Sequence, residues 1–258
     1  MSYVYGLDNN TTYAYLQAAA THFGAFPLYS SMSVLQQVLI GVVKLPVAKL
    51  SDVIGRAEAY TLSVLFYIIG FIVIATSQSI SNVFGGVVLQ AIGNTGTQIM
   101  QQIVIADWVP ADWRGFAIGL VSWPYIVNFA VAPRIVGAVC NNNPVNPADA
   151  CAMTNGWRWG AGMFTIMLPV VTAPIIMVLA LSQRRAQKQN LVQIKPFTRK
   201  NLSTLLFKDF DIPGLILIVA GWLLILLPLQ LHAYAPNNWQ TGYIIAMFVV
   251  GGVCLIGT

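Results

Sequence analysis

The chain has 258 residues and a net charge of +5, but only 8% of its residues are charged and 57% are hydrophobic. Soluble domains carry about 25% charged residues, so this composition excludes an ordinary soluble protein and indicates one that lies in a lipid bilayer. Nucleic-acid binding is not expected, because the basic residues lie in short segments between apolar runs.

Apolar runs of membrane-spanning length occupy most of the sequence. The hydrocarbon core of a bilayer is about 30 Å thick and needs about 20 residues of helix to cross it. Prolines inside the runs are compatible with this assignment, since neighbouring helices can satisfy the backbone groups that a proline frees. We therefore predict membrane-spanning helices near residues 28–47, 59–77, 82–105, 116–138, 159–181, 211–231 and 240–258.

Lysines and arginines are unequally distributed between the two sides of the predicted helices. Eleven lie on one side, whereas only Arg134 and Arg158 lie on the other. Cytoplasmic loops of membrane proteins carry an excess of these residues, so the side with eleven is predicted to be cytoplasmic. The segments predicted to face outward are 1–27, 78–81, 139–157 and 232–239.

The two ends of the chain and its long basic connector predict how it is organised. The first residues, MSYVYGLDNNTTYAY, have the character of the outer end of a helix whose body is absent, and the last, GGVCLIGT, end inside an apolar run. We therefore expect a truncated chain. Its predicted parts are a helical half at 1–181 with most of the first span missing, a cytoplasmic linker at 182–210, and the start of a second half at 211–258.

Polar residues inside the predicted spans are candidates for a transport path. Gln98, Gln101 and Gln102 have the spacing of one helical face. Polar groups within hydrocarbon mark either a water-filled path or hydrogen bonds between helices, and both alternatives remain open. No aspartate or glutamate lies in the interior of any predicted span, so the sequence predicts no proton-carrying residue.

The predicted span at 116–138 carries four further candidates. Trp123, Tyr125 and Asn128 surround a proline and are either contacts for a substrate or packing residues. Arg134 lies near the outer end of the span, about 30 Å along a helix from Arg114. It either attracts an anionic or oxygen-rich substrate or extends its charge to the lipid headgroups.

Cys140 and Cys151 flank the polar segment NNNPVNPADA on the predicted outer side. Disulfides form in oxidising compartments, so the pair is a candidate disulfide, and two free thiols are the alternative. The sequence contains no catalytic motif and no cluster of cysteines and histidines with metal-ligand spacing. We therefore expect no enzymatic activity, no bound metal and no cofactor.

The stretch AKLSDVIGRAEAY, residues 48–60, concentrates charge between two predicted spans. It resembles the loop signature G-x-L-[AS]-D-x-x-G-R-[RK] of the major facilitator superfamily, although Ala48 replaces the first glycine and Ala57 the last basic residue. The resemblance implies a polytopic helix bundle in which Asp52, Gly55 and Arg56 form a cytoplasmic gating contact. The alternative is an ordinary solvated turn.

Longer stretches resemble one family within that superfamily, the fungal siderophore–iron transporters. They are YGLDNNTTYAYLQAAATHFG, KLPVAKLSDVIGRAEAY, IGNTGTQIMQQIVIADWVPADWRGFAIGLVSWPYIVN and NGWRWGAGMF. Members have about fourteen spans, so the seven predicted here would be about half. Leu89 stands where many proton-coupled facilitators have arginine. Trp123 stands where drug antiporters have glycine, which disfavours an antiporter.

The resemblance implies a secondary transporter that imports ferric siderophore chelates by proton-coupled alternating access. Its partners would be a small-molecule ferric chelate, a proton and the bilayer, with the iron carried inside the chelate. The membrane would be the plasma or an endosomal membrane. The alternatives are export of glutathione or a drug against protons, and a truncated product that does not transport.

Overall fold

The computed structural model describes residues 1–140, 151–188, 212–231, 240 and 242–256, and its regular elements there are helical. The predicted all-α fold is confirmed over this part of the chain. The helices are α1 (Ser2–His22), α2 (Phe26–Ile54), α3 (Arg56–Thr76), α4 (Ile80–Trp108), the short 3-10 turn η1 (Ala111–Trp113), α5 (Arg114–Ser122), α6 (Pro124–Val139), α8 (Gly156–Lys188), α10 (Ile212–Leu231) and α11 (Gly242–Ile256).

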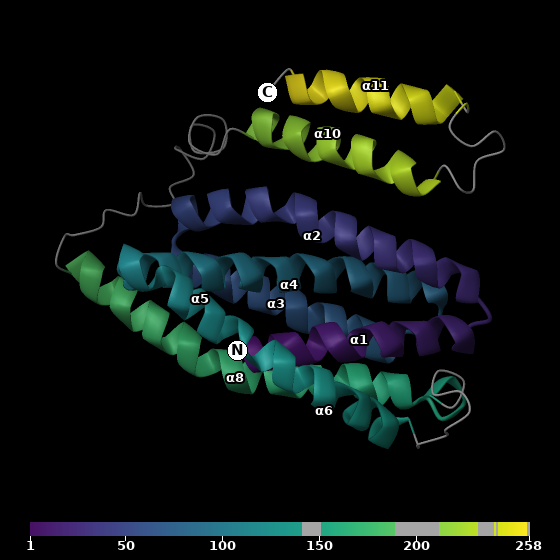
Figure 1. Cartoon of the computed structure of the whole chain (residues 1–258), viewed down its shortest axis with the longest axis horizontal. Helices are drawn as coiled ribbons and strands as arrows, with labels where there is room; N and C mark the ends of the chain where they lie inside the picture. Colours follow the sequence, from purple (N-terminus) through teal and green to yellow (C-terminus); the bar gives the residue numbers. More distant parts are fainter. Residues whose placement is uncertain (141–150, 189–211, 232–239, 241, 257–258) are drawn as a thin grey trace.

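The long helices run roughly along the longest axis of the molecule (Figure 1). α3 and α4 pack together, α8 lies against α3, and α2 lies against α4. α1 contacts α6, α8 and α2, and the pair α10–α11 contacts the rest through α2. The first seven residues of the predicted linker, 182–188, continue α8, and its remainder, 189–210, lies outside the described residues.

Glycines allow α3 and α4 to approach each other closely. A Cβ atom on Gly93 of α4 would collide with the backbone of Tyr67 on α3, and one on Gly70 of α3 would collide with the backbone of Gln90 on α4. Small residues at such contacts are a common device of membrane helices, because close backbone approach increases van der Waals contact. These two glycines therefore bring Tyr67 and Gln90 into one layer of the bundle.

The predicted span 116–138 lies within one helical segment of membrane-spanning length, Ala111–Val139. Within it α5 ends at Ser122 and α6 begins at Pro124, and Trp123 between them keeps helical backbone angles of φ −57° and ψ −40°. Proline has no N–H to donate and its ring crowds the carbonyl of the preceding turn, so the hydrogen bonding of the helix is interrupted at this junction. Pro46, Pro133 and Pro169, in contrast, lie inside helices that continue past them.

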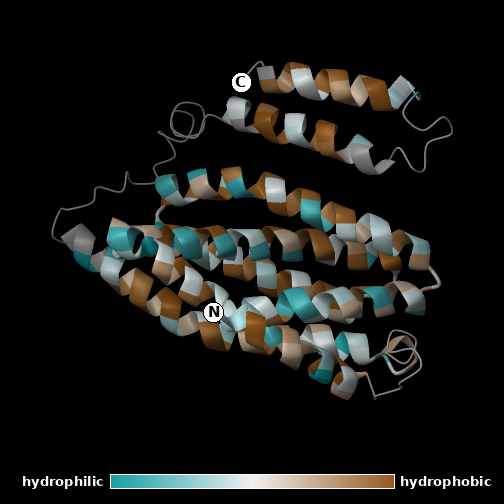
Figure 2. Ribbon diagram, in the orientation of Figure 1, coloured by the Kyte–Doolittle hydropathy of each residue, from teal (hydrophilic) through white to brown (hydrophobic). Residues whose placement is uncertain are grey.

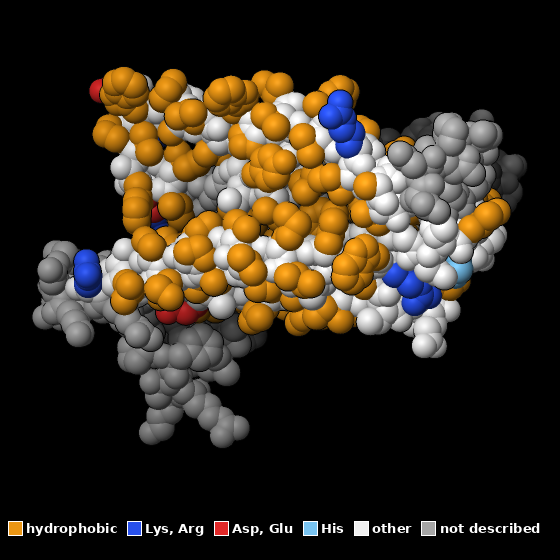
Figure 3. All heavy atoms as spheres, turned by 90° about the horizontal axis from the view of Figure 1, so that it is seen from below, with side chains coloured by type: hydrophobic (Ala, Val, Ile, Leu, Met, Phe, Trp, Pro, Cys, Tyr) orange, Lys and Arg blue, Asp and Glu red, His pale blue; other side chains and the backbone are white. Residues whose placement is uncertain are grey.

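The surface has the character expected of a protein in lipid. Within the described part of the chain, four helical segments have the length and hydropathy of a membrane span, Phe26–Asp52, Arg56–Thr76, Ala111–Val139 and Gly156–Gln183, and two shorter apolar helices follow. The face in Figure 3 is largely hydrophobic, with lysine and arginine side chains at a few separate places. On α6, Phe129 is 78% exposed. Soluble monomers rarely expose apolar surface on this scale.

The largest difference from the sequence-based prediction is α1. Residues Ser2–His22 form a helix inside the bundle, whereas residues 1–27 were predicted to lie on the outer side of the membrane. Figure 2 shows hydrophilic residues along α1. Its buried positions nevertheless include the consecutive residues 4–8 and 18–20, so the helix is covered by its neighbours on more than one face. Asp8 thereby becomes a carboxylate buried within the bundle, on a helix that was not among the predicted spans.

Candidate functional site

Asp8 of α1 lies at the centre of a buried polar cluster and is 1% exposed. Its Oδ1 accepts a hydrogen bond from the Thr12 hydroxyl, and its Oδ2 accepts one from the Tyr67 hydroxyl. Gln90 and Asn94 of α4 each donate a side-chain amide to Oδ2 at 3.1 Å. One carboxylate thus accepts from four neutral donors, and the three on α3 and α4 join these helices to α1.

The local sequence explains why these groups meet. Asp8 and Thr12 are one helical turn apart, as are Gln90 and Asn94, so each pair lies on one face of its helix. Tyr67 reaches the same point because α3 packs closely against Gly93 of α4. The site therefore depends on helix spacing and on the glycines of the α3–α4 contact.

The cluster can hold Asp8 either with or without a proton. Among the described residues no lysine, arginine or histidine forms an ion pair with Asp8. Burial without a cation penalises a carboxylate, whereas the four donors stabilise it. The Thr12 and Tyr67 hydroxyls can donate or accept a hydrogen bond. Asn94 Oδ1 is buried, has no hydrogen-bond partner among the described residues, and offers a further acceptor.

A hydrogen bond extends the cluster to α2. Gln36 donates its side-chain amide to Gln90 Oε1 at 3.1 Å, and Gln36 is only half-buried. A chain of polar groups therefore runs from the partly open face of α2 through Gln90 to Asp8. Asp8, Gln36 and Gln90 were missed as site residues. No regular hydrophobic pattern marks Asp8, because polar and apolar residues follow one another irregularly through MSYVYGLDNNTTYAYL.

Two residues predicted to line a transport path lie beside this cluster. Tyr125 of α6 meets the ring of Tyr5 edge to face, with 5.8 Å between ring centroids. Asn128 of α6 is buried and donates to the backbone carbonyl of Tyr3 at 2.8 Å. Gly6 permits this approach, because a Cβ there would lie 2.7 Å from Asn128 Nδ2.

The other predicted path residues are not drawn together. Gln101 of α4 reaches α1 through a hydrogen bond to Ser2 Oγ, whereas Gln98 is half-buried and Gln102 is exposed. Trp123 is 62% exposed at the α5–α6 break, and Arg134 is exposed on α6. The buried polar face of α4 therefore centres on Gln90 and Asn94, two to three turns before the predicted glutamines.

The charged stretch at residues 48–60 forms the tight turn between α2 and α3. Gly55 has φ of +117° and separates the two helices, a conformation that residues with a side chain rarely adopt. Arg56 forms an ion pair with Asp107 at the end of α4, and Asp52 is exposed on the last turn of α2. Of the predicted gating residues, Arg56 thus connects the turn to a third helix.

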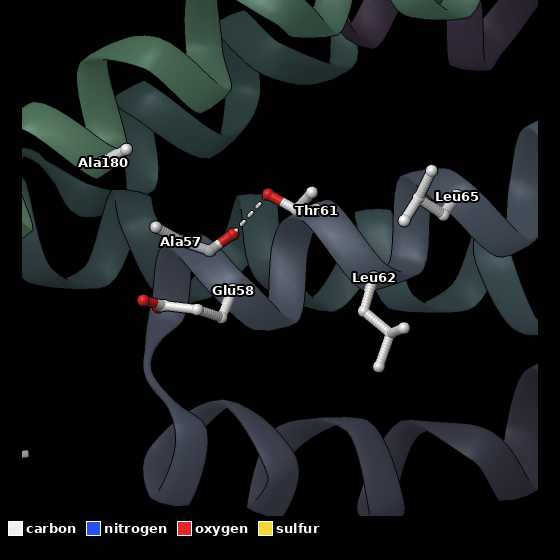
Figure 4. Close-up of a pocket in the computed structure, with 6 residues that line it drawn as sticks. All are labelled: Ala57, Glu58, Thr61, Leu62, Leu65 and Ala180. Atoms are coloured by element: carbon white, nitrogen blue, oxygen red, sulfur yellow. Dashed lines mark hydrogen bonds between the residues drawn. The ribbon is translucent and has the colours of Figure 1, made fainter. Parts of the chain in front are cut away.

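α8 also contacts the α2–α3 turn, through the side chain of Gln183. Gln183 accepts a hydrogen bond from the Ala57 backbone N–H at 3.2 Å and donates one to Glu58 Oε2 at 2.7 Å. It therefore satisfies a free N–H at the start of α3. Next to this contact a shallow pocket of about 350 Å³ lies between α3 and α8, with Leu62, Leu65 and Ala180 in its walls (Figure 4).

Cys140 and Cys151 form a disulfide between the end of α6 and the segment before α8. The residues between them, 141–150, lie outside the described part of the chain. His22, at the end of α1, pairs through Nδ1 with the backbone carbonyl of Ala152 at 2.9 Å. The disulfide therefore lies next to a contact between α1 and the segment that leads into α8.

Replacing Cys140 with serine should destabilise the purified protein. A disulfide that closes a loop of this size contributes about 2–3 kcal/mol, since it restricts the unfolded chain. Thermal unfolding in detergent, with and without reductant, measures the effect. Cys254→Ser, which removes the free cysteine of α11, is the matched control. An equal change in both variants would contradict a stabilising disulfide.

A bundle of membrane-spanning helices with a buried polar cluster at its centre has the construction of a membrane transport protein. The chain belongs to the major facilitator superfamily, whose family model matches residues 1–258. That family consists of transporters rather than enzymes. The chain is accordingly an integral, multi-pass membrane protein.

Curated relatives in fungi match 99% of the chain. The siderophore iron transporter mirC of Emericella nidulans is 35% identical, and the MFS siderochrome iron transporter C of Aspergillus fumigatus is 36% identical. The low affinity heme transporter str3 of Schizosaccharomyces pombe is 35% identical. The chain spans about 40% of the length of these relatives.

Proposed function

We propose that the protein takes part in the import of ferric siderophore chelates by proton-coupled alternating access. The main support is the similarity to siderophore iron transporters along nearly the whole chain. The polar cluster around Asp8 adds a physical reason for coupling to protons, because it offers a neutral, hydrogen-bonded site for a carboxyl group between helices. The iron would travel inside the chelate, and the protein would supply no metal ligand of its own.

The proposed cycle uses the cytoplasmic turn as well as the central cluster. In facilitators, bundles of helices rock about a central site, so that it opens to one side at a time. The Arg56–Asp107 ion pair joins the α2–α3 turn to the end of α4. A contact of this kind favours the arrangement in which it forms and is lost in the other. We place the protein in the plasma membrane or an endosomal membrane.

An uptake assay tests this proposal. The reading frame that contains the chain is expressed in yeast without siderophore carriers of its own, and the uptake of ferric hydroxamate chelates labelled with radioactive iron is measured. We expect uptake above the empty strain, and we expect it to collapse when a protonophore dissipates the proton gradient. No uptake of any chelate, with the protein present at the cell surface, would reject the import of chelates.

Heme is the second candidate substrate, favoured by the 35% identity to str3. The same strains can be supplied with heme as the only iron source. Growth on heme, without uptake of hydroxamate chelates, would assign heme as the substrate. Export of glutathione or a drug has no relative among the transporters reported above and is tested by efflux from preloaded cells.

A further inference from the structure

We propose that Asp8 is the residue that binds and releases the coupling proton, and that Gln90 and Gln36 connect it to the partly open face of α2. This inference rests on the proposed function and assigns its proton site. It starts from three observations about one carboxylate: its burial, the neutrality of its partners and the link to α2.

The first argument is the electrostatic surroundings of Asp8. Its hydrogen-bond partners are Thr12 on α1, Tyr67 on α3, and Gln90 and Asn94 on α4. Further titratable groups that interact with it are the phenols of Tyr5 on α1 and Tyr125 on α6. These partners are uncharged near neutral pH, and no ion pair involves Asp8 among the described residues. A permanent structural carboxylate in such surroundings would normally be paired with a cation.

The second argument is that the cluster can accept the proton. When Asp8 is ionised, both of its oxygens accept hydrogen bonds and all four donors are used. When it is protonated, the carboxyl O–H needs an acceptor. The unpartnered Asn94 Oδ1 and the reorienting Tyr67 hydroxyl are the candidates. The buried Asn94 Oδ1 costs free energy while it has no donor, as when Asp8 is ionised. When Asp8 is protonated, this oxygen can accept the carboxyl O–H.

The third argument concerns what the proton would change. Hydrogen bonds to an ionised carboxylate are roughly twice as strong as those between neutral groups. Protonation of Asp8 would therefore weaken its bonds to Tyr67, Gln90 and Asn94 together. These bonds join α1 to the α3–α4 pair. Proton binding would thus loosen α1 from its neighbours, which is how a bound proton could shift the balance between access states.

A chain of hydrogen-bonded side chains gives the proton a route between Asp8 and α2. Gln36 is half-buried on α2 and donates to Gln90, which in turn donates to Asp8. Side-chain amides can relay a change in hydrogen bonding although they do not themselves titrate. Gln36 and Gln90 are therefore assigned as positioning residues, which hold a polar path between Asp8 and the partly open face of α2.

The test is Asp8→Asn, which keeps the size of the side chain but cannot release a proton. We expect it to lose accumulation of labelled chelate driven by the proton gradient. It should retain exchange of labelled for unlabelled chelate at equal pH on both sides, because exchange needs no net proton movement. The matched control is Asp112→Asn in η1, an exposed aspartate, which should keep both activities.

Infrared difference spectroscopy of the purified full-length protein across a pH range gives a readout that does not depend on transport. The C=O band of a protonated carboxyl group should appear on acidification in the wild type and in Asp112→Asn, and it should be missing in Asp8→Asn. If Asp8→Asn does not fold, Tyr67→Phe serves instead, and it should shift this band to more alkaline pH, because it removes a donor to the ionised form.

Two outcomes would overturn the assignment: accumulation by Asp8→Asn equal to that of the wild type, or a carboxyl band that is unchanged in the Asp8 and Tyr67 variants. Failure of the proposed function has a different signature. In that case the wild type neither accumulates nor exchanges any chelate, whereas the carboxyl band still reports whether Asp8 binds a proton.

Discussion

Replacing Gly93 with alanine should destabilise the protein more than any other single-methyl change in α4. The added Cβ would collide with the backbone of Tyr67, which cannot move aside as a flexible side chain can. α3 and α4 would have to separate, and overpacking of this kind typically costs about 1–3 kcal/mol. The same movement would draw the Tyr67 hydroxyl away from Asp8. We therefore expect both lower thermal stability in detergent and lower proton-driven uptake.

Gly85→Ala is the matched control for this experiment. Gly85 lies on the same helix, is exposed and has no atom within 4 Å of the position of a Cβ. Alanine is favoured over glycine in a helix by about 1 kcal/mol, so this variant should be as stable as the wild type or slightly more stable. Equal melting temperatures for the two variants would show that the close α3–α4 contact does not limit stability.

The apolar spans could be predicted from the sequence because the length and hydropathy of an apolar run are enough to identify a candidate membrane helix. A helix overlaps each predicted span at its place in the chain. The span 116–138 was predicted at its place, but the junction of α5 and α6 before Pro124 was not, since proline interrupts the hydrogen bonding of some membrane helices and lies inside others, as Pro46 and Pro133 do here. Whether a proline interrupts a helix depends on the neighbouring helices that pack against it. The sequence of one helix does not show which helices those are.

The candidate site was the harder part, because its central residue lies on a helix without a hydrophobic run. Because α1 is rich in polar residues, it was not predicted as a helix of the bundle, and Asp8 was assigned to the outer side. Its contacts with Tyr67 and Gln90 join residues 59 and 82 positions apart. They depend on glycines that set the distance between α3 and α4. The hydrophobic pattern of α1 does not mark one buried face, and only packing brings these side chains together.

Replacing Arg56 with alanine should slow transport while leaving the folded protein almost as stable as before. The ion pair with Asp107 is partly exposed, with the two side chains 42% and 36% accessible. Such pairs contribute at most about 1 kcal/mol to stability. If that energy favours only one access state, its loss changes the ratio of the two states by about fivefold. We expect a several-fold lower uptake rate at equal amounts of protein at the cell surface.

The charge reversal Arg56→Asp with Asp107→Arg distinguishes a specific contact from a general effect of charge. The double variant should recover much of the uptake that each single change loses, because it rebuilds the pair in the opposite direction. Arg114→Ala is the control, since it removes a positive charge near the same cytoplasmic end. The Arg114 Nε donates to the Val109 carbonyl at 3.2 Å, and no ion pair of Arg114 is found among the described residues. A double variant no better than the worse single variant would mean that Arg56 acts through its charge alone. In that case Arg56 would help to set the orientation of the protein in the membrane, and its ion pair with Asp107 would not be a gating contact.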